Sequence, residues 1–251
     1  MCNFLSGVVT MEHHPKVLCG DLLHHEVTVH RYKLKPETYR EWEWTIDDDG
    51  KSLTVRATPD ENPNVLKSAI LAKFANRREC LNDCIRQVNE FGGGLYLINL
   101  TSAKGLMFPQ NVGGHLYLSS LTSAKGMTLP QTVGGDLWLA SLTSTKGLTL
   151  PQKVGGYLHL GNLASAKGLK LPQTVGGHLN LGSLTSAKGL TLPQTVGGYL
   201  WLAALTSAKG LTFPQTVGDD LWLNSLPSVA GLPLPQTIGG HVHTKRGKVS
   251  K

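Results

Sequence analysis

Cysteine is absent from the larger part of this 251-residue sequence, because Cys2, Cys19, Cys80 and Cys84 are the only four. No disulfide can therefore join successive segments of the remainder, and a reducing compartment fits best. No uninterrupted run of 18 apolar residues occurs either, which argues against a transmembrane helix. The N-terminus lacks the basic segment, apolar run and cleavage site of a secretory signal. We therefore expect a soluble, cytoplasmic protein.

Acidic residues are scarce after the first third of the chain. Residues 1–91 carry 12 Lys/Arg and 14 Asp/Glu, the repeats carry 8 and 3, and residues 241–251 carry 4 and none. The net charge of +7 therefore comes from the later parts of the chain. We divide the chain into a head (1–91), a repeat region (92–240) and a basic tail (241–251). A basic excess can favour anionic partners, but it is also a common means of keeping a protein soluble.

The repeat region consists of seven copies of one 21-residue unit. Its consensus is x-Leu-x-Leu-x-x-Leu-Thr-Ser-Ala-Lys-Gly-Leu-x-Leu-Pro-Gln-x-Val-Gly-Gly. The units begin at Gly94, His115, Asp136, Tyr157, His178, Tyr199 and Asp220. A fixed period of this length indicates a solenoid, in which each unit buries its apolar face only by stacking on its neighbours.

The alternation Leu-x-Leu, as in Leu116-Tyr117-Leu118, predicts a short strand with an apolar inner face. Val133 points inward again before Gly134-Gly135 turns the chain. One unit then forms one coil, and seven coils at about 4.8 Å each extend over roughly 34 Å. The expected fold is mainly β: a parallel β-solenoid of seven 21-residue coils with a small α+β N-terminal cap domain.

The unit resembles the short leucine-rich repeat-like proteins of bacteria and phages, above all in its Leu-Pro-x-x-Val segment. This resemblance covers residues 94–240 and implies a β-solenoid. The unit departs from ordinary leucine-rich repeats because it has no asparagine ladder and no helical stretch, which favours a straight solenoid over a horseshoe. Fold alone does not imply function.

The head is predicted to be α+β. Strands are expected at 2–10, 26–34, 40–46 and 51–57, with a hairpin turn between the last two. Apolar residues then recur at helical spacing from Leu66 to Val88, and this helix is expected to end at Gly92. We expect it to cover the edge of the first coil.

Two columns of the repeat vary while the packing columns are almost constant. They lie two residues apart on the same strand and therefore on the same outward face. The first column is Gly94, His115, Asp136, Tyr157, His178, Tyr199 and Asp220. The second column is Tyr96, Tyr117, Trp138, His159, Asn180, Trp201 and Trp222.

Exposed aromatic residues gathered with His and Asp are typical of a recognition surface. The alternative is that the rings only stiffen the sheet by cross-strand stacking. If the rings project into water, replacing Trp138, Trp201 and Trp222 by serine should leave the melting temperature nearly unchanged. His241 and His243 could extend the same face into an eighth, incomplete coil.

A second ladder consists of one lysine per unit: Lys104, Lys125, Lys146, Lys167, Lys188 and Lys209. Repulsion among the six ammonium groups could be relieved by a polyanion, although solvated edge lysines also prevent edge pairing. Aromatic rings and lysines together would suit single-stranded nucleic acid if they shared a face. Without a base-reading motif, nucleic-acid binding is expected to be weak and sensitive to salt.

The candidate residues for catalysis and for metal binding all lie in the head. Removal of Met1 would leave Cys2 at the N-terminus, and its surroundings resemble the opening of N-terminal-nucleophile hydrolases, in which the α-amine acts as the base. This resemblance makes Cys2 an alternative catalytic residue, although the head lacks an oxyanion segment. The spacings of the candidate zinc ligands match no established pattern, so no metal or cofactor is expected. Those candidates are His13, His14, His24, His25, Cys19, Cys80 and Cys84.

We conclude from the sequence that a non-enzymatic recognition protein is the best interpretation. It would act as an inhibitor, decoy or adaptor that holds a protein partner against the aromatic face. The alternatives are a Cys2 hydrolase with a solenoid docking arm and polyanion binding through the lysines. Pro227 and Pro233 in the last unit discourage further coils. No helix is expected after that unit to cover its apolar end, so an end-to-end homodimer that buries this end is also expected.

Overall fold

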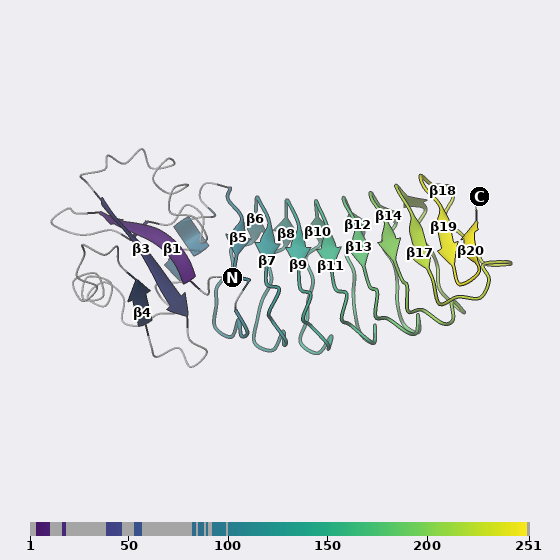
Figure 1. Cartoon of the computed structure of the whole chain (residues 1–251), viewed down its shortest axis with the longest axis horizontal. Helices are drawn as coiled ribbons and strands as arrows, with labels where there is room; N and C mark the ends of the chain where they lie inside the picture. The colour runs from purple at the N-terminus through teal and green to yellow at the C-terminus, as the bar shows by residue number, and fades with distance from the viewer. Residues whose placement is uncertain are drawn as a thin grey trace.

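The computed structural model describes residues 92–98 and 100–249, together with helical residues 82, 83, 85–87 and 89. It also describes the backbone of four strands between residues 4 and 56. Figure 1 shows the coils following one another along the long axis, from β5 to β20 near the C-terminus. The predicted parallel β-solenoid of about seven coils is confirmed.

The four early strands form one antiparallel sheet in the order β2-β1-β3-β4. Three of them agree with the predicted strands, and the expected hairpin pairs β3 with β4 from Glu43↔Arg56 to Ile46↔Leu53. The sequence did not predict β2, which pairs with β1. Their bounds are β1 Phe4–Thr10, β2 Val17–Leu18, β3 Tyr39–Ile46 and β4 Leu53–Arg56.

The described end of the predicted helix contacts the first coil. Ile85 is fully buried within the core of the solenoid, and the amide of Met107 donates a hydrogen bond to Asn82 Oδ1 over 3.0 Å. The amide of Gly92 bonds to the Asn89 carbonyl at 2.9 Å, and the positive φ of 67° at Gly92 is the expected helix end. Whether the head covers the whole edge of the first coil stays a prediction.

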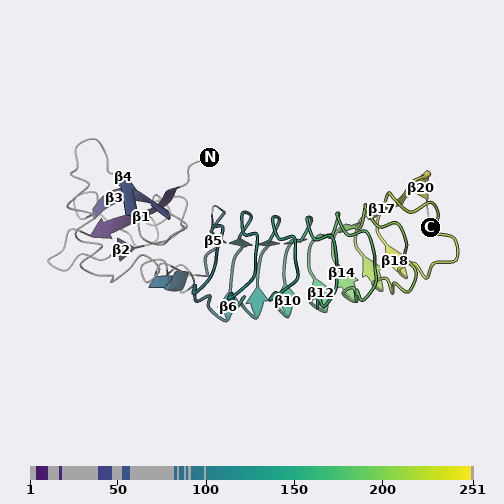
Figure 2. The same ribbon diagram turned by 90° about the horizontal axis from the view of Figure 1, so that it is seen from below.

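Each coil contributes one strand to each of two sheets, which lie on separate sides of the coil (Figure 2). The first sheet has nine strands, which are parallel apart from β20. They are β5 Leu95–Tyr96, β7 Leu116–Tyr117, β9 Leu137–Trp138, β11 Leu158–His159, β13 Leu179–Asn180, β15 Leu200–Trp201, β17 Leu221–Leu223, β19 Val242–Thr244 and β20 Gly247–Val249.

The second sheet has seven parallel strands, one from each coil. They are β6 Asn111–Val112, β8 Thr132–Val133, β10 Lys153–Val154, β12 Thr174–Val175, β14 Thr195–Val196, β16 Thr216–Val217 and β18 Thr237–Ile238.

The register of both sheets places identical columns of the repeat side by side. Leu158, for example, pairs with Leu137 on one side and Leu179 on the other. All three leucines are fully buried. Because every coil repeats the same apolar columns, the core is a continuous stack between the two sheets, and the outward residue of each strand is held at one position per rung.

The Gly-Gly turns let successive coils approach closely. A Cβ on Gly176 would collide with the carbonyl oxygen of Gly155 in the preceding coil, and its distance to the carbonyl carbon would be 2.9 Å. The backbone can therefore stack at strand spacing only if this position has no side chain. The second position of the turn, which is glycine in every unit except at Asp219, has a different role that concerns the outward face described below.

The C-terminal end of the stack is only partly covered. β19 adds an eighth rung in which His243 pairs with Trp222, so the eighth incomplete coil is confirmed. β20 then folds back antiparallel on β19 and occupies the edge of the first sheet. Leu232, Leu234 and Ile238 are only half-buried there, whereas their equivalents in the preceding coil are buried. The end-to-end homodimer stays a prediction.

Candidate recognition surface

An unbroken chain of ring contacts runs along the outward face of the first sheet from β5 to β19. We call it the aromatic ladder. Centroid distances between successive rings lie between 3.6 and 5.9 Å. Its members are Tyr96, Tyr117, Trp138, Tyr157, His178, Tyr199, Trp201, Trp222 and His243, and His159 contacts it beside Trp138. The structure therefore brings together the aromatic residues of both predicted columns.

The rings do not project freely into water. All of them except His243 are half-buried, and His243 is only 7% exposed. Neighbouring rings remove much of one another's contact with solvent, which is a physical reason for large aromatic residues on this face. Stacking between the rings therefore accounts for part of their recurrence along this face, and the remaining exposed surface is what a partner could contact.

The two halves of the aromatic ladder present different parts of the rings. Towards the C-terminus the rings are parallel, at 17° for Trp201–Trp222 and 6° for Trp222–His243. Each of these rings covers the face of its neighbour, so the ring edges are the parts that a partner can contact. Towards the N-terminus the Tyr96–Tyr117 and Tyr117–Trp138 pairs are edge-to-face. Such pairs leave parts of ring faces available as well.

The first column contains hydrogen-bond acceptors that join successive coils. His115 Nδ1 accepts the amide of Asp136 at 3.0 Å, and Asp136 Oδ1 accepts the amide of Tyr157 at 2.7 Å. His178 and Asp220 accept the amides of Tyr199 and His241 in the same way. A Cβ on the second glycine of the turn would collide with these side chains. At four rungs, His and Asp therefore join successive coils by accepting a backbone amide, a role that the sequence did not lead us to predict. The signal in the sequence was the second glycine of the turn, which leaves space for these side chains.

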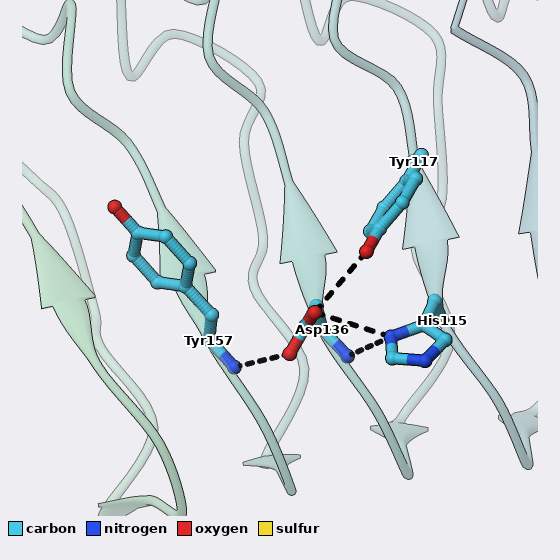
Figure 3. Close-up of polar contacts among 4 residues, drawn as sticks. All are labelled: His115, Tyr117, Asp136 and Tyr157. Carbon is cyan, nitrogen blue, oxygen red and sulfur yellow. Dashed lines mark hydrogen bonds and ion pairs between the residues drawn. The ribbon is translucent and has the colours of Figure 1, made fainter. Parts of the chain in front are cut away.

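Asp136 is the centre of a polar cluster on the N-terminal half (Figure 3). Its Oδ2 lies 3.2 Å from the Tyr117 hydroxyl, which donates to it, and 3.2 Å from His115 Nδ1. Burial raises the pKa of Tyr117 to about 12, with a further contribution from the Asp136 charge. The pKa of Tyr157 is also raised, first by burial and then by its hydrogen bond with Tyr199. Both phenols therefore stay neutral hydrogen-bonding groups near neutral pH.

Asp220 forms the corresponding cluster at the C-terminal half. Its Oδ2 lies 2.9 Å from His243 Nε2, and its Oδ1 accepts the His241 amide at 2.7 Å. The amide of His241 is the main cause of the lowered pKa of Asp220, and His243 adds to it. Each carboxylate is held by neighbours on two sides, and each keeps about a quarter of its side chain exposed, at 26% for Asp136 and 24% for Asp220.

His159 should make the stability of the solenoid depend on pH. Burial lowers its pKa below the usual 6.5, so the folded chain binds this proton less readily than the unfolded chain. The contribution is fully present above pH 6.5 and is lost as the pH falls through the folded pKa. Urea denaturation at a series of pH values between 7 and 5 should show the free energy of unfolding falling with this proton uptake.

The matched control is His159→Asn, because the next rung already carries asparagine. Asn180 Oδ1 accepts the amide of Gly182 at 2.8 Å, just as His159 Nδ1 accepts the amide of Gly161 at 3.2 Å. The variant keeps a side-chain acceptor for the Gly161 amide but has no group that titrates in this pH range. A variant that loses as much stability as the wild type over this range would show that His159 is not the responsible group.

The lysine ladder lies on a different side of each coil. After the first-sheet strand the chain bends, and a separate segment follows in which Ser102 pairs with Ser123 and Ser186 with Ser207. Only beyond this segment does the lysine corner occur, and all six lysines are exposed. The serine segment therefore separates the aromatic ladder from the lysine corner along each coil.

The described residues contain no group of three or more His, Cys, Asp or Glu side chains able to hold a metal ion. Cys2 and the candidate zinc ligands of the head, from His13 to Cys84, lie outside the described residues. The structure therefore does not test the hydrolase alternative. In the part of the chain that the structure describes, no helix is long and apolar enough to cross a membrane.

Comparisons of the chain with protein-family models, with curated proteins and with solved structures gave no match.

Proposed function

We propose that this protein is a non-enzymatic recognition protein that binds a protein partner along the aromatic ladder. The observation that carries the proposal is the continuity of the ladder, since nine rings contact one another over eight rungs. Tyrosine and tryptophan are the residues most enriched where protein interfaces derive their affinity. A rigid row of such rings loses little conformational entropy on binding.

Stacking alone does not account for the composition of the ladder. The rings keep polar groups at their edges, such as the Tyr157 hydroxyl, which accepts a hydrogen bond from Asn180 Nδ2 at 3.0 Å. An amphipathic edge of this kind suits the mixture of apolar and hydrogen-bonding groups on a protein surface. Asp136 and Asp220 add negative charge to the first column, so we expect the partner surface to carry lysine or arginine opposite them.

The experiment blocks the face without removing a ring. Ala140 and Ala203 follow Trp138 and Trp201 by two residues, and both are half-exposed. Ala140→Glu with Ala203→Glu should place charged side chains beside the indoles at little cost in stability. Proteins captured from an extract of the source cells would be identified by mass spectrometry, and the affinity of the recovered partner for both forms would then be measured by calorimetry. We expect a loss of binding of about 100-fold or more, as for the loss of an interface hot spot.

The matched control is Thr132→Glu with Thr195→Glu, because these residues occupy the outward positions of the second sheet. This variant should bind the partner with unchanged affinity. Equal losses in both variants would show that charge or folding, and not the aromatic ladder, governs binding. Unchanged affinity in the Ala140/Ala203 variant would contradict the proposed function.

A further inference from the structure

The lysine ladder is set on a corner that is built in the same way in six coils. In each coil the lysine amide donates to the hydroxyl oxygen of the serine two residues before it, over 3.2 to 3.4 Å. The glycine that follows has a positive φ of 73° to 78°. Because the corner is identical, the lysines emerge at one position per rung and form a straight row.

The fold does not require lysine at this corner. In the seventh coil the position is Ala230, and its amide still donates to Ser228 Oγ at 3.1 Å. Gly231 keeps the same conformation, with a φ of 75°. The backbone corner is therefore complete without the ammonium group, and the lysine side chains contribute only to the surface.

The charge of this row is not neutralised by the described residues. Within the described residues no lysine takes part in an ion pair, since the ion pairs there involve arginine or histidine. The only acidic residues of the repeats are Asp136, Asp219 and Asp220. Asp136 and Asp220 lie immediately before β9 and β17, and each accepts the backbone amide of a residue in the next coil. Like charges about 4.8 Å apart along the row repel one another, which an anion can relieve.

We propose that the lysine ladder is a second binding site, for a linear polyanion, and that the phosphodiester backbone of single-stranded nucleic acid is the chemistry that fits it best. Five rungs of about 4.8 Å separate the six lysines, which gives a row roughly 24 Å long. Phosphates follow one another at about 3.4 Å along one strand of B-form DNA. A single strand can extend to bring its phosphates into line with the wider spacing of the lysines.

Two further observations define the ligand. The row is one residue wide, because alanine or threonine precedes each lysine and glycine follows it. The only large apolar side chains exposed among the described residues are Met107 and Val249, so the edge has little to insert into a lipid surface. The aromatic ladder lies on another side of the coil, so base readout does not accompany the charge. Binding should therefore be independent of sequence and strongly dependent on salt.

The test is fluorescence anisotropy of a labelled oligothymidylate long enough to span the row, titrated with the full chain at several NaCl concentrations. Six lysine–phosphate contacts give a slope of about −4 in log K against log salt, at about 0.7 per contact for a single strand. Affinity should therefore fall about 300-fold between roughly 50 and 200 mM salt. Lys125→Gln, Lys167→Gln and Lys209→Gln together should halve the slope.

The control variant carries Lys153→Gln and Lys170→Gln, because these lysines belong to the same coils but lie outside the row. It should keep nearly the full slope, and thermal melting should show both variants folded, as Ala230 leads us to expect. Equal slopes for the two variants would overturn the proposal. So would a ladder variant that binds the oligonucleotide normally but no longer sediments with phosphatidylserine vesicles, because the ligand would then be a membrane. The site is independent of the aromatic ladder, so either proposal can fail alone.

Discussion

Replacing Gly176 with alanine should lower the free energy of unfolding by about 3 kcal/mol or more, as severe overpacking does. A glycine-to-alanine change ordinarily stabilises a protein when the backbone can accept it. Here the new Cβ would collide with the Gly155 carbonyl group. Neither backbone can move aside, because both are bonded to the coils on either side; the Gly176 amide itself bonds to the Val154 carbonyl at 3.0 Å. Urea denaturation followed by circular dichroism would measure the loss.

Gly168→Ala in the same coil is the matched control. Nothing lies within 4 Å of a Cβ at this position, but its φ is 75°. The change therefore adds only the cost of a left-handed alanine, about 1 to 2 kcal/mol. If Gly176→Ala were no more destabilising than Gly168→Ala, close stacking of the Gly-Gly turns would not be what sets the spacing of the coils.

Replacing Trp201 and Trp222 together with serine should also destabilise the solenoid. The pair removes three ring contacts, with Tyr199, between the two indoles, and with His243. At about 0.5 to 1.5 kcal/mol each, these contacts contribute about 1.5 to 4.5 kcal/mol. Thermal melting should show a clear fall in the melting temperature. This replaces the expectation from the sequence that tryptophans on an outward face can be removed at almost no cost.

Trp201→Phe with Trp222→Phe is the control, because smaller rings can keep most of the stacking. We expect it to melt close to the wild type. A serine variant with an unchanged melting temperature would mean that the ring contacts do not stabilise the fold. Loss of binding by that variant could then be assigned to recognition alone.

Much of the solenoid could be predicted because the same pattern of buried apolar residues occurs in all seven units. The Leu-x-Leu alternation predicted strands such as β7, and the inward position predicted for Val133 is the buried position of β8 in the second sheet. The closing hairpin of β19 and β20 was not predicted, since residues 241–249 lie outside the repeat and only His241 and His243 hinted at a further rung.

The sequence predicted which residues belong to the candidate site but not which contacts they make with one another. Periodicity shows that Trp222 and His243 face outward, but it cannot show that their rings stack at 6°. Nor could it show that the His178 ring accepts a backbone amide of the next coil. Such bonds depend on side-chain torsions and on the space left by a glycine one coil away. Periodicity also could not show whether the aromatic ladder and the lysine ladder share a face, because this depends on how the chain bends between them.

The most direct test of the aromatic ladder as the binding surface is quenching of its own fluorescence. In a Trp42→Phe, Trp44→Phe background, the only tryptophans left are Trp138, Trp201 and Trp222. Acrylamide quenching would be measured for this form alone and with its purified protein partner. We predict that partner binding lowers the quenching constant, because the half-exposed indoles become covered. A partner that binds with the same affinity and leaves the quenching constant unchanged would contradict the account.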